Sequence, residues 1–255
     1  MQRTDNNFSP EERGLIFGRN AVLEAVRSGR EIDRVYIIKG ASSGALVPII
    51  EKCRAKKIPI KEVPSQKLDF MTGGATHQGI VASVAAKSYC SLEDIFKSAE
   101  EKNSPAFVII CDGLEDPHNL GAIIRTAEAT GVDGIIIPKH RSVSVNATVA
   151  KSASGALEYV NICKVTNIAN AIDELKENGF WVYGADMDGE SWFSPDFTGK
   201  TAIVIGSEGN GISRLVKDKC DGIVSMPMNG KINSLNASVA AGILMYEVTR
   251  QRIKK

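Results

Sequence analysis

Uncharged hydrogen-bonding side chains, a carboxylate and an arginine gather in three short segments of this chain, residues 112–121, 206–211 and 226–238. Each segment directly follows or begins at the end of a predicted strand. In an open α/β sheet, ligands bind beyond the carboxyl ends of the strands. We therefore expect the three segments to form one binding site that holds a polar ligand through hydrogen bonds.

The first segment contains Asn119 and leads into a helix that carries Arg125. An arginine presents a planar fork of donors that suits a phosphate, and Arg125 is close enough to the loop to share a face with it. Taken alone, a helix cap at Asn119 and a surface arginine are the better explanation of this segment.

The second segment has the spacing G-x-x-G-x-G, with Glu208 as its one carboxylate. Its glycines allow the backbone to approach a flat ligand closely, although a tight turn with an exposed Glu208 is the simpler interpretation. In the third segment, Ser234, Asn236 and Ser238 lead into the last helix, where their simplest role is capping.

The front half of the chain alternates predicted helices and strands and forms a small α/β unit that ends near Ala86. Its expected elements are a helix at 18–28, a strand at 34–38, a helix at 46–55 and strands at 58–63 and 79–84. A polar connecting helix follows at 91–102, where Ser91 and Asp94 have the spacing of a capping pattern.

The second half opens with a strand at 106–110 that is almost wholly apolar, as strands buried on both faces of a parallel sheet are. The further expected strands are 134–137, 180–184, 202–205 and 222–226, and the expected helices are 120–130, 168–178 and 238–252. The last helix shows an apolar stripe through Val239, Ile243 and Tyr246. This alternation predicts an open parallel α/β sheet.

Composition narrows the class of protein. Of 255 residues, 43% are hydrophobic and 24% charged, as in ordinary globular proteins. No apolar run reaches the roughly 20 residues that span a bilayer, and residues 1–13 lack the apolar centre of a secretory signal, so we expect a cytoplasmic protein. Five scattered cysteines and three histidines favour neither a disulfide framework nor a metal site.

Charge is distributed unevenly between the two halves. Residues 1–88 hold 14 Lys and Arg against 9 Asp and Glu, which gives +5, and the remainder holds 17 against 21, which gives −4; together they make the net +1. A basic front half favours contact with a polyanion such as RNA.

Two nucleotide-binding motifs are excluded. Gly199-Lys200-Thr201 resembles the end of a phosphate-binding P-loop, but Ser194 stands where the first glycine is required, and the segment precedes a strand. Residues 206–211 lack the G-x-G-x-x-G order and come late in the sheet, whereas a dinucleotide fingerprint follows the first strand. A nucleotide-dependent oxidoreductase is therefore disfavoured.

Taken together, the three segments resemble the ordered motifs of the SpoU branch of the SPOUT methyltransferase superfamily. The resemblance covers residues 107 to about 250, through Asn119-x-Gly121-x-x-x-Arg125, Gly206-Ser207-Glu208-Gly209-x-Gly211, and Pro227 with Ser234-Leu235-Asn236-x-Ser238. The front half, beginning Phe17-Gly18-Arg19-Asn20-Ala21-Val22, is similar to the small RNA-binding domain of bacterial 23S rRNA guanosine 2′-O-methyltransferases. Related tRNA enzymes carry a similar domain.

The resemblance implies an α/β fold whose parallel sheet ends in a deep trefoil knot, preceded by a small α/β RNA-binding domain. It implies an RNA-binding domain at 1–88, a linker helix at 89–104 and a methyltransferase domain at 105–255. It also implies a homodimer with the active site at the interface, and S-adenosylmethionine as the methyl donor without any metal. The cofactor-binding residues would then be Ala185, Gly206, Met226, Pro227 and Leu235, and the catalytic residues Asn119, Arg125, Glu208, Ser234 and Asn236.

The expected activity is 2′-O-ribose methylation of RNA, most readily a guanosine in 23S rRNA. We expect Arg125 to hold a phosphate and orient the hydroxyl, because a guanidinium with a pKa above about 12 is a poor base. Candidates for RNA contact in the front domain are Arg19, Arg27 and Arg30. Two alternatives stay open: the same chemistry on tRNA, and an inactive RNA-binding factor.

Overall fold

The computed structural model describes residues 14–41, 44–84, 89–102 and 104–253. The predicted polar start at 1–13 and the predicted end of the first unit near Ala86 lie outside these residues. Contacts divide the chain into two compact units: unit 1 comprises Met1–Ser88 with Val145–Tyr159, and unit 2 comprises Tyr89–Ser144 with Val160–Lys255. Among the described residues, no helix combines the length and the apolar character that crossing a bilayer requires.

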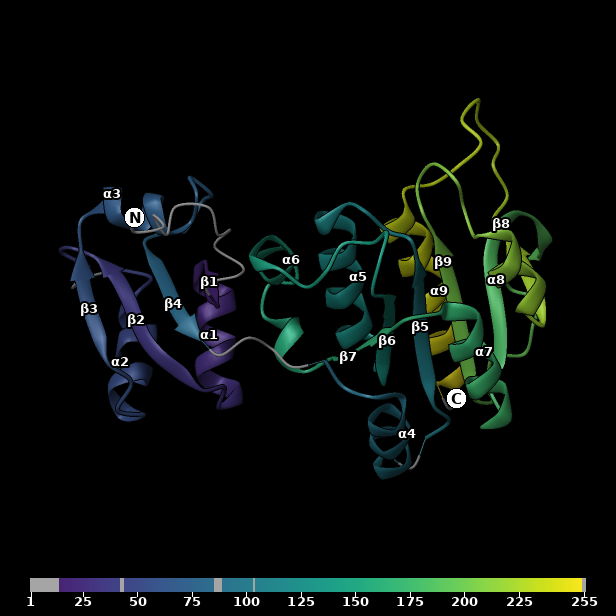
Figure 1. Cartoon of the computed structure of the whole chain (residues 1–255), viewed down its shortest axis with the longest axis horizontal. Coiled ribbons are helices and arrows are strands. Elements are labelled where there is room, and N and C mark those ends of the chain that lie inside the picture. The colour runs from purple at the N-terminus through teal and green to yellow at the C-terminus, as the bar shows by residue number, and fades with distance from the viewer. Residues whose placement is uncertain (1–13, 42–43, 85–88, 103, 254–255) are drawn as a thin grey trace, which may run out of the picture. The chain divides into compact units, whose positions relative to one another are not determined.

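Unit 1 contains a four-stranded sheet in the order β1-β4-β2-β3, with β2 parallel to β3 and the other pairs antiparallel. Its elements are β1 Leu15–Phe17, α1 Arg19–Ser28, β2 Ile32–Ile38, α2 Val47–Ala55, β3 Ile60–Val63, α3 Ser65–Met71 and β4 Ile80–Val84 (Figure 1). The predicted helices and strands of the front half are therefore present. Strand β1 and helix α3 were not predicted, because three and seven residues are too few to show a periodic pattern.

A segment distant in sequence completes unit 1. Helix α6 (Ala147–Ser152) and the 3-10 turn η1 (Ala156–Glu158) pack against α1 and β1. Arg30 Nη1 lies 2.7 Å from Glu158 Oε1, and the hydroxyl of Tyr159 donates to Glu24 Oε2 at 2.8 Å. The side chain of Arg30 is only 13% exposed in this ion pair, whereas Arg19 and Arg27 are exposed, and Arg27 forms an ion pair with Glu24 at 2.6 Å.

Unit 2 contains a six-stranded sheet in the order β10-β8-β9-β5-β6-β7, and every paired strand in it is parallel. The strands are β5 Phe107–Asp112, β6 Gly134–Pro138, β7 Asn161–Val165, β8 Trp181–Ser191, β9 Thr201–Gly206 and β10 Gly222–Ser225. The predicted open parallel α/β sheet is confirmed. Strand β7 was not predicted, and the trefoil knot that the resemblance implies stays a prediction.

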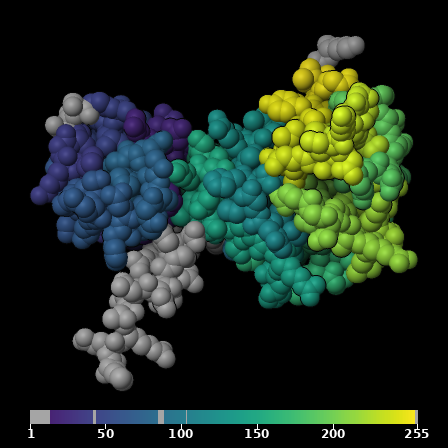
Figure 2. Space-filling model, turned by 90° about the horizontal axis from the view of Figure 1, so that it is seen from above, coloured from purple at the N-terminus to yellow at the C-terminus, as the bar shows by residue number. Residues whose placement is uncertain are grey.

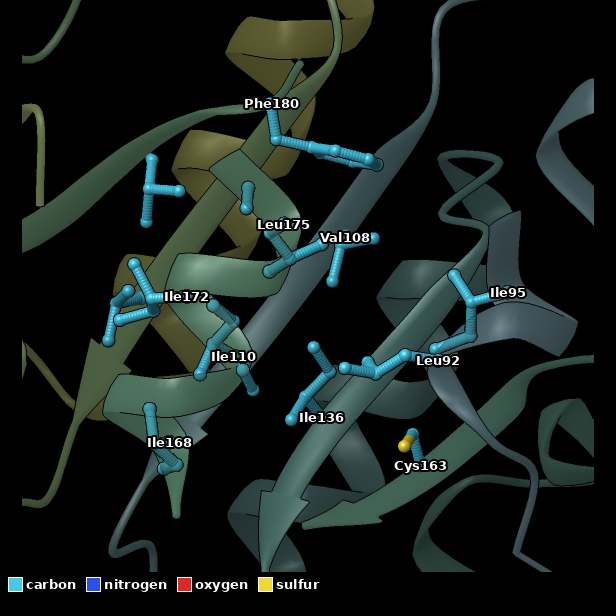
Figure 3. Close-up of a cluster of buried hydrophobic side chains, with 14 of the residues drawn as sticks. Leu92, Ile95, Val108, Ile110, Ile136, Cys163, Ile168, Ile172, Leu175 and Phe180 are labelled. Atoms are coloured by element: carbon cyan, nitrogen blue, oxygen red, sulfur yellow. The ribbon is translucent and has the colours of Figure 1, made fainter. Parts of the chain in front are cut away.

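Helices cover both faces of this sheet. On one face, α4 (Leu92–Glu101), α7 (Ile168–Glu177) and α8 (Arg214–Lys219) form a core with alternate strand residues such as Val108 and Ile110 (Figure 3). The other face lies against α5 (Pro117–Ala129) and α9 (Ala237–Arg252), which also pack against each other. Phe107, Val108, Ile109 and Ile110 are all almost inaccessible to solvent, which explains the continuous apolar run of β5.

Two helix starts test the capping patterns. Helix α4 begins with the capping box that Ser91 and Asp94 predict, and its Leu92, Ile95 and Ala99 join the core of unit 2. Helix α5 begins three residues earlier than predicted, because Asp116 is its N-cap and accepts a hydrogen bond from the backbone of His118 at 2.8 Å. Asn119 is therefore not a cap.

The predicted apolar stripe of α9 does not face the core. Val239 is 50% exposed and Tyr246 57% exposed, whereas the buried side chains are Ala241, Leu244, Met245 and Val248. The predicted helix at 238–252 is present, but α9 is apolar on two sides, so periodicity alone does not identify the side that faces the sheet.

The C-terminal end of α9 is anchored by one side chain. The guanidinium of Arg252 donates to the backbone carbonyls of Phe197 at 2.9 Å and Pro105 at 2.7 Å, and also to those of Ala106 and Gly199. It lies over the ring of Phe107, at 5.4 Å from the centroid. Burial lowers the pKa of Arg252 from its usual value, although the nearby charge of Asp133 opposes the shift.

We predict that Arg252→Ala lowers the free energy of unfolding by about 2 kcal/mol, because hydrogen bonds from a charged donor to four carbonyls are lost. Chemical denaturation followed by circular dichroism measures the change. Arg214→Ala is the matched control, since that arginine is 96% exposed, and it should change stability by less than about 0.5 kcal/mol. Equal stability of the two variants would show that Arg252 is not an anchor.

Candidate active site

The three polar segments meet at one edge of the sheet of unit 2. Asp112 at the end of β5 pairs in register with Gly206 at the end of β9, and Ala185 of β8 pairs with Ile205. Because the strands are parallel, the loops that follow them leave the same edge. On the surface, the residues of the last segment and of the loops before it adjoin on one side of unit 2, in yellow and yellow-green (Figure 2).

One hydrogen-bonded chain joins the three segments. The side-chain amide of Asn119 donates to Glu208 Oε1, and Asn236 Nδ2 donates to Asn119 Oδ1 at 3.0 Å. Asn119 is only 6% exposed, so both ends of a buried amide are satisfied by the other two segments. The structure thus brings together Asn119, Glu208 and Asn236, as the sequence predicts, and gives Asn119 a linking role.

Asn236 has two roles at once. Its Oδ1 accepts hydrogen bonds from the backbone of Ser238 at 3.0 Å and Val239 at 3.3 Å, which makes it the N-cap of α9. Its amide nitrogen is directed to Asn119 instead. The capping interpretation of Asn236 is therefore correct but incomplete.

The second segment forms a closed turn. Ser207 and Gly211 exchange backbone hydrogen bonds at 3.0 Å in both directions, and Glu208, Gly209 and Asn210 form the tip of the turn. A Cβ atom at Gly206 would collide with the backbone of Gly211, so only glycine fits where the turn begins. The glycine pattern therefore serves the turn that places Glu208.

A pocket of about 680 Å³ opens between these loops. All five predicted cofactor-binding residues line it, together with Glu208 and Ser234. The remaining lining residues are Asp186, Met187, Ile205, Ser207, Gly209, Asn210, Gly211, Ser225, Met228, Asn233, Ala237 and Ala240. None of the described residues that line the pocket is a lysine or an arginine.

Asp186 is a lining carboxylate that sequence reasoning missed. It accepts a hydrogen bond from Lys217 Nζ at 2.9 Å. Burial opposes its ionisation, but the hydrogen bonds from Lys217 and from the backbone of Met187 prevail and lower the pKa of Asp186 below its usual value. Its position directly after Ala185, in a strand that continues past the sheet edge, is the signal that could have identified it.

Arg125 lies apart from this hydrogen-bonded chain. It is on the exposed face of α5 together with His118, seven residues earlier, whereas Asn119 faces the buried side. Among the described residues, Arg125 has no hydrogen-bond or ion-pair partner. The structure therefore leaves its guanidinium free for a group outside this chain.

The pocket suits a ligand that is partly apolar and carries positive charge. Met226, Pro227 and Leu235 offer an apolar wall for a flat ring, and the carboxylate of Glu208 favours a cation, whereas Lys217 offsets the charge of Asp186. A ligand rich in phosphates would meet carboxylates without a lining cation. Among the described residues, no group of three or more His, Cys, Asp and Glu side chains is arranged to hold a metal ion.

Family models match both halves of the chain. Residues 106–246 match the model described as the SpoU rRNA Methylase family. Residues 15–90 match the model described as RNA 2′-O ribose methyltransferase substrate binding.

Individual relatives cover nearly the whole chain. A protein of Bacillus subtilis named as a TrmH family tRNA/rRNA methyltransferase is 48% identical over 243 residues, 95% of this chain and 97% of its own length. The crystal structure of the SpoU methyltransferase AviRb from Streptomyces viridochromogenes with the cofactor AdoMet is 25% identical, with a TM-score of 0.79, over 94% of this chain and 90% of that chain. The TrmH/SpoU tRNA modifying enzyme of A. aeolicus is 29% identical, with a TM-score of 0.54, and covers 63% of this chain and 83% of that chain.

The matched models include the polar loops at the sheet edge and extend over both halves of the chain. The chain therefore belongs to the SpoU family of the SPOUT methyltransferases, and it is an RNA 2′-O-ribose methyltransferase.

Proposed function

We propose that this chain transfers a methyl group from S-adenosylmethionine to the 2′-hydroxyl of a guanosine in 23S rRNA. The observation that carries the cofactor assignment is the pocket beside Asn119, which has an apolar wall and the carboxylate of Glu208, and no described lysine or arginine forms an ion pair with Glu208. S-adenosylmethionine combines a flat adenine with a positively charged sulfonium, and both parts suit such a pocket. A volume of about 680 Å³ is also within the range of about 300 to 1,000 Å³ of small-molecule sites.

The residues divide the binding task by chemistry. Met226, Pro227 and Leu235 form the apolar wall, and backbone groups at Ala185 and Gly206 are within the same pocket. When bound, the cofactor supplies an activated methyl group, so the protein has to align a ribose hydroxyl in line with it and let a proton depart. Ser234, at the pocket wall, offers a hydroxyl for positioning.

Arg125 is the residue that we assign to the RNA side of the site. A permanently protonated guanidinium cannot accept the hydroxyl proton, but its planar fork can hold the phosphate next to the target ribose. Its lack of a partner among the described residues supports this role. The hydroxyl proton would depart to solvent when the bound cofactor supplies its methyl group to the ribose oxygen that Arg125 orients.

The small domain supports an rRNA substrate. We assign residues 1–88 to RNA binding, 89–104 to the connecting helix and 105–255 to methyl transfer. The relative described as a tRNA modifying enzyme covers 63% of the chain, and the family model that matches residues 106–246 is described as the SpoU rRNA Methylase family. The basic front half and the exposed Arg19 and Arg27 agree with contact to an RNA backbone. An rRNA substrate also implies an enzyme of the cytoplasm.

We further assign the outward stripe of α9 to a homodimer interface. Val239 and Tyr246 are large apolar side chains that are 50% and 57% exposed, on a helix whose opposite side is packed in the core. Apolar patches of this kind on a stable helix mark protein contacts. A second copy of the chain would cover the stripe and lie next to the site at the start of α9.

We predict that purified protein adds a methyl group to 23S rRNA and that mapping of 2′-O-methylation places it on a single guanosine. Arg125→Ala should lower the rate at least about 100-fold while leaving cofactor affinity within about twofold, because the hydroxyl loses its orientation. Parallel assays on total tRNA test the alternative substrate. Methylation of tRNA but not of rRNA would reject the rRNA assignment, and no methylation by the wild type of either RNA would support an inactive binding factor.

We predict that Glu208→Gln weakens binding of S-adenosylmethionine about tenfold but changes binding of S-adenosylhomocysteine by less than threefold. The two ligands differ by the methyl group and the sulfonium charge, and the glutamine still accepts a hydrogen bond from Asn119. Isothermal titration calorimetry measures both affinities. Asp186→Asn is the matched control, because Lys217 already offsets that charge, and it should show a smaller difference. An equal loss for both ligands would contradict an electrostatic role for Glu208.

We predict that Val239→Glu, placed in the exposed stripe of α9, converts a dimer into a monomer and lowers methyl transfer at least about tenfold. Burying an unpaired carboxylate in an apolar interface is strongly unfavourable. Sedimentation velocity measures the assembly, and thermal unfolding checks that the fold is kept. A wild type that sediments as a monomer while fully active would refute the interface.

A further inference from the structure

A basic loop follows β6 at the same sheet edge as the site. Lys139, His140 and Arg141 are three consecutive residues, and all three are exposed. Among the described residues, none of them has an ion-pair or hydrogen-bond partner for its side chain. The loop therefore presents unneutralised donors on a unit whose sequence is acidic overall.

Despite its exposure, the loop is fixed to the first segment of the site. Ser142 Oγ donates to the carbonyl of Leu114 at 2.9 Å, and the backbone of Val143 donates to the same carbonyl at 2.7 Å. On its other side, the backbone of Lys139 donates to the carbonyl of Val165 at 2.8 Å, and Lys164 Nζ donates to Ser144 Oγ at 2.7 Å. Hydrogen bonds to both sides hold the basic residues in one place.

The position of this loop is close to the catalytic edge. A Cβ atom built on Gly113 would lie 3.7 Å from the carbonyl oxygen of Arg141 and 4.0 Å from Ser207 Cβ. Gly113 therefore stands between the basic loop and the turn that carries Glu208. In space, the backbone of Arg141 is therefore near the segments that we assign to the cofactor and the target ribose.

The backbone of Arg141 is unusual for its residue type. Its φ is 56°, in the left-handed region, which glycine adopts readily and which is unfavourable for an arginine. A glycine at this position would make the loop easier to form. Unfavourable backbone of this kind is common at binding sites, but Lys57 has the same φ, so it is the position of Arg141 beside the site that supports a binding role.

Nearby carboxylates do not neutralise the loop. Glu115 and Asp116 are exposed in the first segment, but Asp116 accepts the capping hydrogen bond of α5, and neither is paired with the basic loop. Arg125, also without a partner, is on the helix that this segment begins. No described residue supplies an acceptor for these donors, so they are available to a ligand.

We propose that the loop at 139–141 binds a phosphate of the substrate RNA adjacent to the target nucleotide, with Arg141 as the main contact. This inference rests on the proposed function, and it adds a second phosphate site to the one assigned to Arg125. Its role is to fix the position of the RNA across the site. The ribose of the target nucleotide, and not that of the adjacent nucleotide, then faces the cofactor pocket. Arg141 is a positioning residue, and it does not touch the reacting atoms.

The test compares Arg141→Gly and Arg141→Asn with the wild type in methyl-transfer assays on the RNA that the wild type modifies. Both replacements suit a left-handed backbone and both remove the charge. We expect KM for the RNA to rise about tenfold, with a smaller change in kcat. Affinity for S-adenosylmethionine should stay within twofold, and Tm should not fall. The dependence of RNA binding on log salt should become shallower by about one, as expected for one lost phosphate contact.

Three further variants separate charge from loop shape. Lys97→Gln removes one charge from the exposed side of α4 and should leave KM and the salt dependence near those of the wild type. Arg141→Lys keeps the charge and should restore the salt dependence while recovering part of KM. Lys57→Gly, at a position with the same φ of 56°, shows how much stability the backbone change alone adds.

The outcomes are distinguishable. If the wild type methylates RNA and both uncharged variants have its KM and its salt dependence, the phosphate site at Arg141 is refuted and the proposed function stands. If the wild type modifies no RNA, the proposed function fails first. A fall in Tm with a loss of cofactor affinity would mean that Arg141 supports the fold, which also overturns the inference.

Discussion

The structure of the site depends on one buried amide. Asn119 stands between Glu208 and Asn236, donating to the first and accepting from the second, so three loops that are far apart in sequence share one pair of hydrogen bonds. Leaving either end of a buried amide unsatisfied costs about 1 to 3 kcal/mol. An aspartate in its place could not donate to Glu208, and an apolar residue would release both partners. Only an asparagine-like group fits, because it is a donor at one atom and an acceptor at the next.

This amide can act only because the sheet places its partners. β5 and β9 are paired from Phe107–Thr201 to Asp112–Gly206, so their loops begin at the same level. The central strands are buried on both faces, by α4, α7 and α8 on one side and by α5 and α9 on the other. A shift of register by one residue would turn this buried set of side chains over and separate Asn119 from Glu208. The rigid core of unit 2 therefore fixes the positions of the loops at the edge of the sheet.

Charge is sorted around this edge. The pocket offers the carboxylate of Glu208 and has no lining lysine or arginine, whereas Arg125 and Arg141 are exposed and have no partner among the described residues. Under the proposed assignments, a cationic cofactor and an anionic RNA would meet surfaces of opposite sign. Such an arrangement keeps RNA phosphates from occupying the cofactor pocket, because a phosphate there would face carboxylates. The two ligands come together only where both surfaces adjoin.

The sequence by itself determined much of this protein, because local patterns carry local structure. The apolar run at 106–110 predicted a doubly buried strand, and Ser91 and Asp94 predicted a capping box. Residues of the second and third polar segments line the pocket, and the resemblance to the SpoU family implied the five cofactor-binding residues. What only the tertiary structure decided depended on distant partners. Asn119 in sequence resembles a cap, and its link to Glu208 spans 89 residues. Likewise, α9 is apolar on two sides, and Val145–Tyr159 packs in unit 1 although its neighbours in the chain are in unit 2. Local sequence patterns predict that a side chain is buried or hydrogen-bonded. They do not identify its partner, because folding alone brings residues that are distant in the sequence into contact.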